Sequence, residues 1–124
     1  MTPFGKRVRR LRQDRGLSLK TMAYDISVSA AYLSALEHGR RGTPTWSLVQ
    51  RIITYFNIIW DEAEELVQLA QISDPRIVVD TAGLPPEATE LANILARQIA
   101  FLSPDETASL LGLLKQSIRK PNRA

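Results

Sequence analysis

Apolar residues recur at helical rather than strand spacing along almost the whole chain. Before residue 74 the pattern falls into five short segments separated by turn residues. The apolar positions that repeat in the first, fourth and fifth segments are Phe4, Val8 and Leu11; Leu48, Val49, Ile52, Ile53 and Phe56; and Leu66, Leu69 and Ile72. The pattern predicts a compact all-α unit of five helices over residues 1–73.

The second and third helices are each expected to begin after a serine. Ser18 and Ser29 stand where a side-chain oxygen can accept a hydrogen bond from the first helical turn. An apolar pair brackets each serine as a hydrophobic staple would: Leu17 with Met22, and Val28 with Leu33. Gly16 and Gly39 are expected to end the first and third helices. The second and third helices are then joined by a turn over residues 25–28.

Residues 74–84, DPRIVVDTAGL, interrupt the helical pattern with a proline, a β-branched run and a glycine. We expect an extended linker here. Within it, Ile77, Val78 and Val79 have the β propensity of an edge strand, which could pair across a dimer.

Two more helices are expected over residues 85–120, joined as a hairpin. Pro85 and Pro86 open the first, which is expected to end at residues 102–104. Ser103 and Glu106 have the spacing of a capping box for the second. Residues 121–124 are expected to be a disordered tail.

The hairpin is apolar over wide faces. Two helices bury too little on their own, so they must pack on another surface, and we expect a second copy of the chain. The residues expected to form this dimer contact are Leu91, Ile94, Leu95, Ile99, Leu102, Leu110, Leu111, Leu114 and Ile118.

Composition excludes several kinds of site. A chain of 124 residues without cysteine forms no disulfide and no thiolate zinc site, and His38 is the only histidine. The basic start has no signal-peptide core, and no apolar stretch is long enough for a membrane span. These features predict a cytoplasmic protein with no membrane association, and we expect neither metal nor cofactor.

Charge is distributed unevenly along the chain. Residues 1–57 hold ten basic and three acidic residues, a net charge of +7, whereas residues 58–124 hold six basic and ten acidic residues, a net charge of −4. The basic half favours a polyanionic partner. The acidic group Asp61, Glu62, Glu64 and Glu65 suits the positive end of a helix dipole better than a metal site.

The two short helices with a capped second helix have the form of a helix-turn-helix. The stretch from Phe4 to Ile58 resembles the Cro/cI-type repressor family, also called the XRE or lambda-repressor-like type. The matching pieces are VRRLRQDRGLS, TMAYDISVSAAYLSALEHGRR, and Pro44 with LVQRIITYFNI. The resemblance implies a five-helix DNA-binding domain in which Ala23 packs where the two motif helices cross.

The resemblance also implies roles for particular residues. Arg12 and Glu37 fall where the family links its first and third helices, and we expect a structural pair. The groove-facing positions of the third helix are Ser29, Ala30, Ala31, Ser34 and Ala35, with Tyr32 at the edge. Alanine cannot read bases by bidentate hydrogen bonds, so direct readout is expected to be sparse.

Phosphate contacts are expected to supply most of the affinity. The candidates are Lys20, Arg40 and Arg41, together with Arg7 and Arg10 on the first helix, for which a solvated helix face is an equal alternative. His38 is interpreted as a surface residue near the phosphate backbone, while Trp46 and Trp60 are interpreted as core residues.

Two departures from the family pattern stand out. Ser27 occupies the turn where the family commonly has glycine, so a positive φ there would make the turn costlier. Leu19 replaces a glutamine that commonly opens the second helix and contacts phosphate.

The sequence predicts a sequence-selective double-stranded DNA-binding regulator, a repressor, that binds a pseudo-palindromic operator as a homodimer. No nucleophile and base set or phosphate-cradling loop is present, so an enzyme is not expected. Activation through RNA polymerase is one alternative. Others are an antitoxin or adaptor whose hairpin binds a partner protein, and a sensor that holds a small ligand between hairpins.

Overall fold

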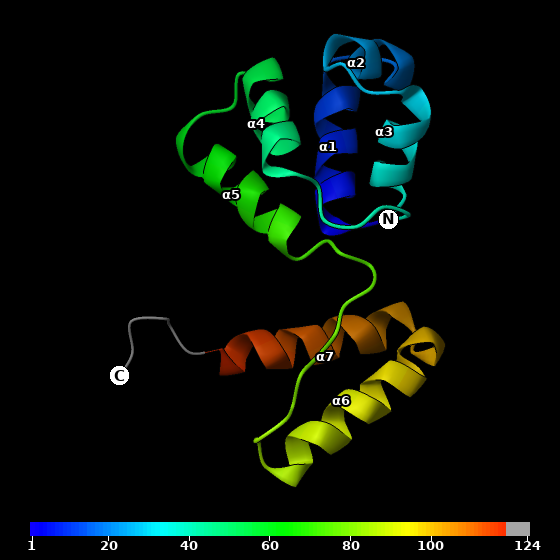
Figure 1. The fold of residues 1–124 in the computed structure, drawn as a ribbon, viewed down its shortest axis with the longest axis vertical. Coiled ribbons are helices and arrows are strands. Elements are labelled where there is room, and N and C mark those ends of the chain that lie inside the picture. The colour runs from blue at the N-terminus through cyan, green and yellow to red at the C-terminus, as the bar shows by residue number, and fades with distance from the viewer. Residues whose placement is uncertain (119–124) are drawn as a thin grey trace. The chain divides into compact units, whose positions relative to one another are not determined.

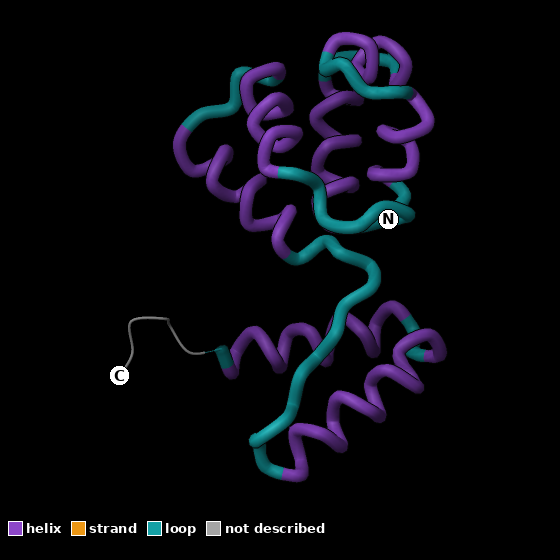
Figure 2. The backbone as a smooth tube through the Cα atoms, viewed as in Figure 1, coloured by secondary structure: helices purple, strands orange, loops and turns teal. Residues whose placement is uncertain are grey.

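The computed structural model describes residues 1–118, so the end of the expected hairpin, residues 119–120, and the expected disordered tail, 121–124, lie outside the described residues. The chain divides into two compact units, one over Met1–Ile77 and one that begins at Val78. The division falls inside the segment expected to be a linker. Over residues 1–118 the chain forms helices and loops but no strand (Figure 2), which confirms the predicted all-α class.

The first unit contains the five predicted helices (Figure 1). They are α1 (Pro3–Asp14), α2 (Leu19–Asp25), α3 (Ala30–Glu37), α4 (Trp46–Tyr55) and α5 (Trp60–Gln71). Helix α1 lies between α3 on one side and the α4–α5 pair on the other. This central position makes α1 the support for the helices that surround it.

The core of the first unit is formed by the apolar stripes that the periodicity predicted. Its buried residues are Phe4, Val8, Met22, Ala23, Ile26, Leu33, Leu36, Leu48, Val49, Ile52, Phe56, Leu66 and Ala70. Leu11, Ile53 and Leu69 pack against this core and are partly buried. Ile72, which was expected on the same stripe, is 67% exposed because α5 has already ended at Gln71.

Both predicted serine caps are present. The backbone N–H of Thr21 donates to Ser18 Oγ at 3.0 Å, and that of Tyr32 donates to Ser29 Oγ at 3.0 Å. Thr2 and Thr45 cap α1 and α4 in the same way, and these two caps were not among the predicted ones. A cap of this kind stabilises a helix by about 1 kcal/mol.

The glycines that follow α1 and α3 have the left-handed backbone that such ends require. Gly16 has φ +64° and Gly39 has φ +75°, which confirms them as helix stops. Gly5 has a different role that periodicity did not reveal. A Cβ atom there would lie 2.5 Å from the carbonyl oxygen of Glu37. Helix α1 can therefore approach the end of α3 closely only because residue 5 has no side chain.

The expectation that Trp46 and Trp60 are core residues is wrong. Trp46 is 66% exposed and Trp60 is 82% exposed. Each is the first residue of its helix, α4 or α5, and lies off the stripe that faces the core. Trp60 also has φ +54°, an uncommon backbone conformation for an aromatic residue.

The second unit is a helical hairpin. It contains α6 (Pro86–Gln98), a 3₁₀ turn η1 (Ile99–Phe101) and α7 (Pro104–Ser117). The α-helix thus ends earlier than the predicted boundary at residues 102–104, because the chain tightens into η1 before Leu102. Ser103 and Glu106 form the predicted capping box, with reciprocal hydrogen bonds of 3.1 and 2.8 Å.

No residue from Val78 to Ile118 is buried. The nine residues expected at the dimer contact are all exposed except Leu102, which is partly buried. Within the described residues, the hairpin therefore has no core of its own.

Candidate nucleic-acid interface

Helices α2 and α3 pack directly on each other. Ala23 is 1% exposed, and the backbone N–H of Val28 donates to the Ala23 carbonyl at 3.0 Å. Ile26 and Leu33 are buried on the inner side of the motif. The small side chain at position 23 allows the two helices to approach closely, so the motif is a rigid support for the outer face of α3.

The outer face of α3 carries only small side chains and one tyrosine. Ser29, Ala30 and Ala31 are exposed, while Tyr32, Ser34 and Ala35 are partly buried. Leu33 and Leu36 point into the core, as the resemblance implied. Ser29 Oγ accepts the Tyr32 N–H as a cap, but its hydroxyl hydrogen remains available to an external acceptor.

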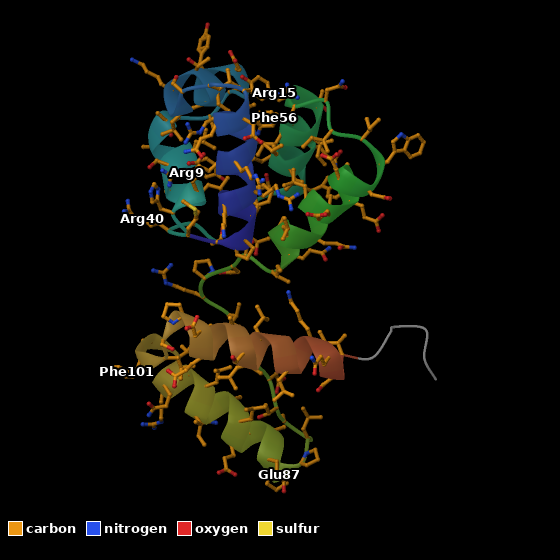
Figure 3. All side chains as sticks on the ribbon, turned by 180° about the vertical axis from the view of Figure 1, so that it is seen from behind. Arg9, Arg15, Arg40, Phe56, Glu87 and Phe101 are labelled. Atoms are coloured by element: carbon orange, nitrogen blue, oxygen red, sulfur yellow. The ribbon has the colours of Figure 1, made fainter. Side chains whose placement is uncertain are left out.

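Cationic side chains lie at both ends of the motif. Lys20 is exposed in the first turn of α2, and Arg40 and Arg41 are exposed in the loop after α3. Arg40 projects outward from this loop (Figure 3). The Arg41 guanidinium lies 5.2 Å from the centre of the Tyr32 ring, a cation–π contact that the residue spacing did not predict. Tyr32 and Arg41 therefore act as one positioned group at the edge of α3.

Several arginines of the basic half hold helices together. Arg7, a phosphate candidate, forms an ion pair with Glu65 of α5. Arg15 donates to the Phe56 carbonyl at 2.5 Å and lies over the Phe56 ring (Figure 3). Arg51 donates to the Ile26 carbonyl at 2.7 Å. Arg10, the other candidate on α1, is exposed. Of the two candidates on α1, Arg7 is thus paired, whereas Arg10 forms no ion pair within residues 1–118.

Arg12 and Glu37 form the expected link between α1 and α3. Arg12 Nε and Nη2 each donate to one Glu37 carboxylate oxygen at 3.1 Å, and Nη1 donates to the Leu17 carbonyl at 3.1 Å. Glu37 is 1% exposed. The bidentate geometry satisfies both carboxylate oxygens, so the charge can be buried. The pair fixes the C-terminal end of α3 to α1.

A tyrosine joins α4 to the end of α2. Tyr55 donates its hydroxyl hydrogen to Asp25 Oδ2 at 2.6 Å. This hydrogen bond, with a smaller effect of burial, raises the pKa of Tyr55 above its ordinary value.

His38, at the end of α3, is exposed, and its Nδ1 lies 2.8 Å from the Ser34 carbonyl oxygen.

The acidic first turn of α5 has no metal-binding arrangement. Asp61 and Glu62 lie in that turn, where they complement the helix dipole, and Glu65 pairs with Arg7. Residues 1–118 contain no cluster of three or more histidine or acidic side chains that could hold a metal ion. In the same part of the chain no helix has the length and apolar character that crossing a membrane requires.

A family model described as a helix-turn-helix domain matches residues 3–66. Three curated proteins are similar in sequence. The HTH-type transcriptional regulator DdrOP3 of Deinococcus deserti is 35% identical over 102 residues, which cover 81% of this chain and 71% of that protein. Two Bacillus subtilis proteins match over 61 residues, 49% of this chain: the uncharacterized HTH-type transcriptional regulator RghRB, 31% identical, and the HTH-type transcriptional repressor RghR, 33% identical.

The chain belongs to the helix-turn-helix family of transcriptional regulators, as the resemblance predicted. Its match covers 44% of RghRB and 45% of RghR, less than half the length of each. A chain from the solved complex of the SinR and SinI proteins covers 80% of this chain at 18% identity, with a TM-score of 0.42, and the alignment takes in 99% of that chain.

Proposed function

We propose that the chain is a sequence-selective double-stranded DNA-binding repressor that binds a pseudo-palindromic operator as a homodimer. The observation that carries this proposal is the outer face of α3, where exposed small residues lie between exposed cations. Lys20 stands before this face, and Arg40 and Arg41 follow it. A helix with a buried inner face and such an outer face suits the major groove, with the cations at the flanking phosphates.

Readout by this surface would rely on shape more than on hydrogen bonds. Ala30, Ala31 and Ala35 have methyl groups that can contact thymine methyls but cannot distinguish guanine from adenine. Ser29 and Ser34 are the hydrogen-bonding groups of the same face, and small side chains let the helix sit deep in the groove. We therefore expect A·T-rich half-sites with modest information content.

The hairpin is proposed to hold the two copies together. Its apolar residues are exposed on α6, η1 and α7, and nothing from Val78 to Ile118 is buried. Pairing with a second copy would give this unit a core and increase its stability. In the dimer, the two α3 helices should lie about 34 Å apart, one turn of DNA.

A second candidate is that the hairpin binds a different protein, as an antitoxin or adaptor does, while DNA binding regulates the chain's own expression. The exposed apolar surface of α6 and α7 favours this candidate as well. Contact with RNA polymerase through the same surface would make the protein an activator. The apolar surface that stays exposed on the purified dimer separates the candidates, because a dimer that covers the hairpin leaves no such surface for another protein.

The test is selection from a random duplex pool at two salt concentrations, with the full chain and with a fragment of residues 1–77. Every buried residue of the described range 1–118 lies within this fragment, and Ser73, whose hydroxyl accepts the Phe4 N–H at 2.9 Å, is retained. We expect the full chain to select a palindrome, and the fragment to bind one half-site more weakly. Recovery of no preferred sequence by the full chain would overturn the proposal.

A further inference from the structure

Residues 76–80, Arg-Ile-Val-Val-Asp, have an apolar centre that no other part of residues 1–118 covers. Ile77 is 72% exposed, Val78 is 95% exposed and Val79 is 60% exposed. The chain runs from Ile77 to Thr81 without a turn or bend. Within residues 1–118, the backbone N–H and C=O groups of Ile77 and Val79 have no hydrogen-bond partner in the protein. Three adjacent β-branched residues with unpaired backbone groups have the properties of an edge strand without a neighbour.

The charges at the two ends of this segment identify its partner. Arg76 precedes the three apolar residues and Asp80 follows them. In an antiparallel pair of identical strands centred on Val78, Arg76 stands opposite the partner's Asp80 and Asp80 stands opposite the partner's Arg76. The segment is therefore complementary to itself in that one register, as a two-fold interface requires.

We propose that residues 76–80 pair with the same segment of a second copy as a two-stranded antiparallel ribbon, with Val78 opposite Val78 of the partner subunit. This inference rests on the proposed homodimer, because a two-stranded ribbon is only marginally stable alone. The apolar contact between the hairpins keeps the two segments at a high effective concentration. The charged pairs of the ribbon then fix how the two chains align.

Local hydrogen bonds select the pattern of the ladder. The Arg76 N–H already donates to Asp74 Oδ1 at 2.9 Å, so Arg76 belongs to a pair that exchanges no backbone hydrogen bonds. Because such pairs alternate along antiparallel strands, the Val78 pair is also of this kind, and Ile77 exchanges both bonds with the partner's Val79. The ladder thus uses the backbone groups that are unpaired in the single chain.

The same register determines which side chains share a face of the ribbon. Alternate residues point to opposite faces, so Ile77 and Val79 of both copies share one apolar face. Arg76, Val78 and Asp80 share the other. Asp80 Oδ1 accepts the Ala82 N–H at 2.9 Å, which leaves Oδ2 for the partner's Arg76. Side chains of pairs without backbone bonds lie closest together, which favours the cross-strand ion pairs.

Charge reversal tests the register in the full chain. Arg76→Asp and Asp80→Arg each place like charges opposite one another, so we expect each variant alone to dimerise about tenfold more weakly than the wild type. When the two variants are mixed, both cross-strand pairs are complementary again, and heterodimers should form in preference to either homodimer. Glu64→Arg reverses an exposed charge on α5 and is the control, with unchanged dimerisation.

Sedimentation equilibrium gives the dissociation constants, and amide hydrogen exchange reads the ladder directly. In the wild-type dimer the amides of Ile77 and Val79 should be protected, whereas that of Val78 should exchange freely. A wild-type chain that remains monomeric overturns the homodimer and the ribbon together. A wild-type dimer whose charge variants dimerise normally, with no alternation in exchange, overturns the ribbon and leaves the homodimer in place.

Discussion

Arg12 of α1 and Glu37 of α3 are far apart in sequence but form a bidentate ion pair. The distances from Arg12 Nε and Nη2 to the two Glu37 carboxylate oxygens are both 3.1 Å. Glu37 is buried, and the pair lies where the outer face of α3 ends. The orientation of α3 therefore depends on a charge that would be unpaired if either partner were lost.

Removing one partner of this pair should destabilise the first unit strongly. Glu37→Ala leaves the Arg12 guanidinium without its partner, and Arg12→Ala leaves the buried carboxylate unpaired. Each variant should therefore have a free energy of unfolding, measured in urea, about 3 kcal/mol lower than the wild type. Arg10→Ala, on the exposed side of the same helix, should change it by less than about 0.5 kcal/mol. The double variant Arg12→Met with Glu37→Met should be more stable than either alanine variant. A loss of equal size in Arg10→Ala would contradict the assignment.

Gly5 should be the most restrictive position on α1. In Gly5→Ala the new methyl would meet the Glu37 backbone, whose carbonyl oxygen is 2.5 Å from the Cβ position, so α1 and α3 must separate. We expect a loss of at least about 2 kcal/mol in thermal or urea unfolding. Gly112→Ala is the matched control, because nothing lies within 4 Å of its Cβ position in α7. There, alanine should favour the helix. An unchanged melting temperature for Gly5→Ala would show that this approach is not constrained.

Ser27 has φ +62° in the turn between α2 and α3, where glycine would be relaxed. Ser27→Gly should therefore stabilise the first unit by about 1 kcal/mol, measured as a rise in the urea midpoint. Ser29→Gly makes the same chemical change at φ −75° and removes a cap, so it should be slightly destabilising. If both variants behaved alike, backbone conformation at position 27 would not be the cause.

The Tyr55–Asp25 hydrogen bond predicts a loss of stability at alkaline pH. Because the pKa of Tyr55 is raised in the folded state, its contribution is complete below the ordinary tyrosine pKa of 10.0. It is lost as the pH rises through the higher folded value. Tyr55→Phe should lower stability at neutral pH and flatten this alkaline decline in urea unfolding. Tyr24→Phe, at an exposed tyrosine whose hydroxyl has no hydrogen-bond partner within residues 1–118, should leave the profile unchanged.

The fold could be predicted from the sequence because independent local signals agreed. For α3, the Ser29 cap, the buried stripe of Leu33 and Leu36 and the Gly39 stop all pointed to the same helix. Trp46 and Trp60 were misplaced because a large apolar side chain at the first residue of a helix need not share its stripe. The end of α6 was also misplaced, since nothing in the periodicity distinguishes a 3₁₀ turn from a last α-helical turn.

The candidate interface was less fully predictable. The resemblance supplied Arg12, Glu37 and the outer positions of α3. It could not show that Arg7 turns to Glu65 of α5, because that contact depends on how helices far apart in sequence pack together. The approach of Arg41 to the Tyr32 ring and the requirement for glycine at position 5 also arise only in the folded chain.

The central claim is that the outer face of α3 enters the major groove of DNA. The most direct measurement is the affinity of Ala31→Glu for the duplex that the wild type selects, compared with Gln68→Glu, which adds the same charge on the exposed side of α5. A carboxylate in the groove meets neighbouring phosphates, so Ala31→Glu should bind at least about a hundredfold more weakly with unchanged stability and dimerisation. Gln68→Glu should stay within about threefold of the wild type. Equal affinity of the Ala31→Glu variant and the wild type would contradict the account.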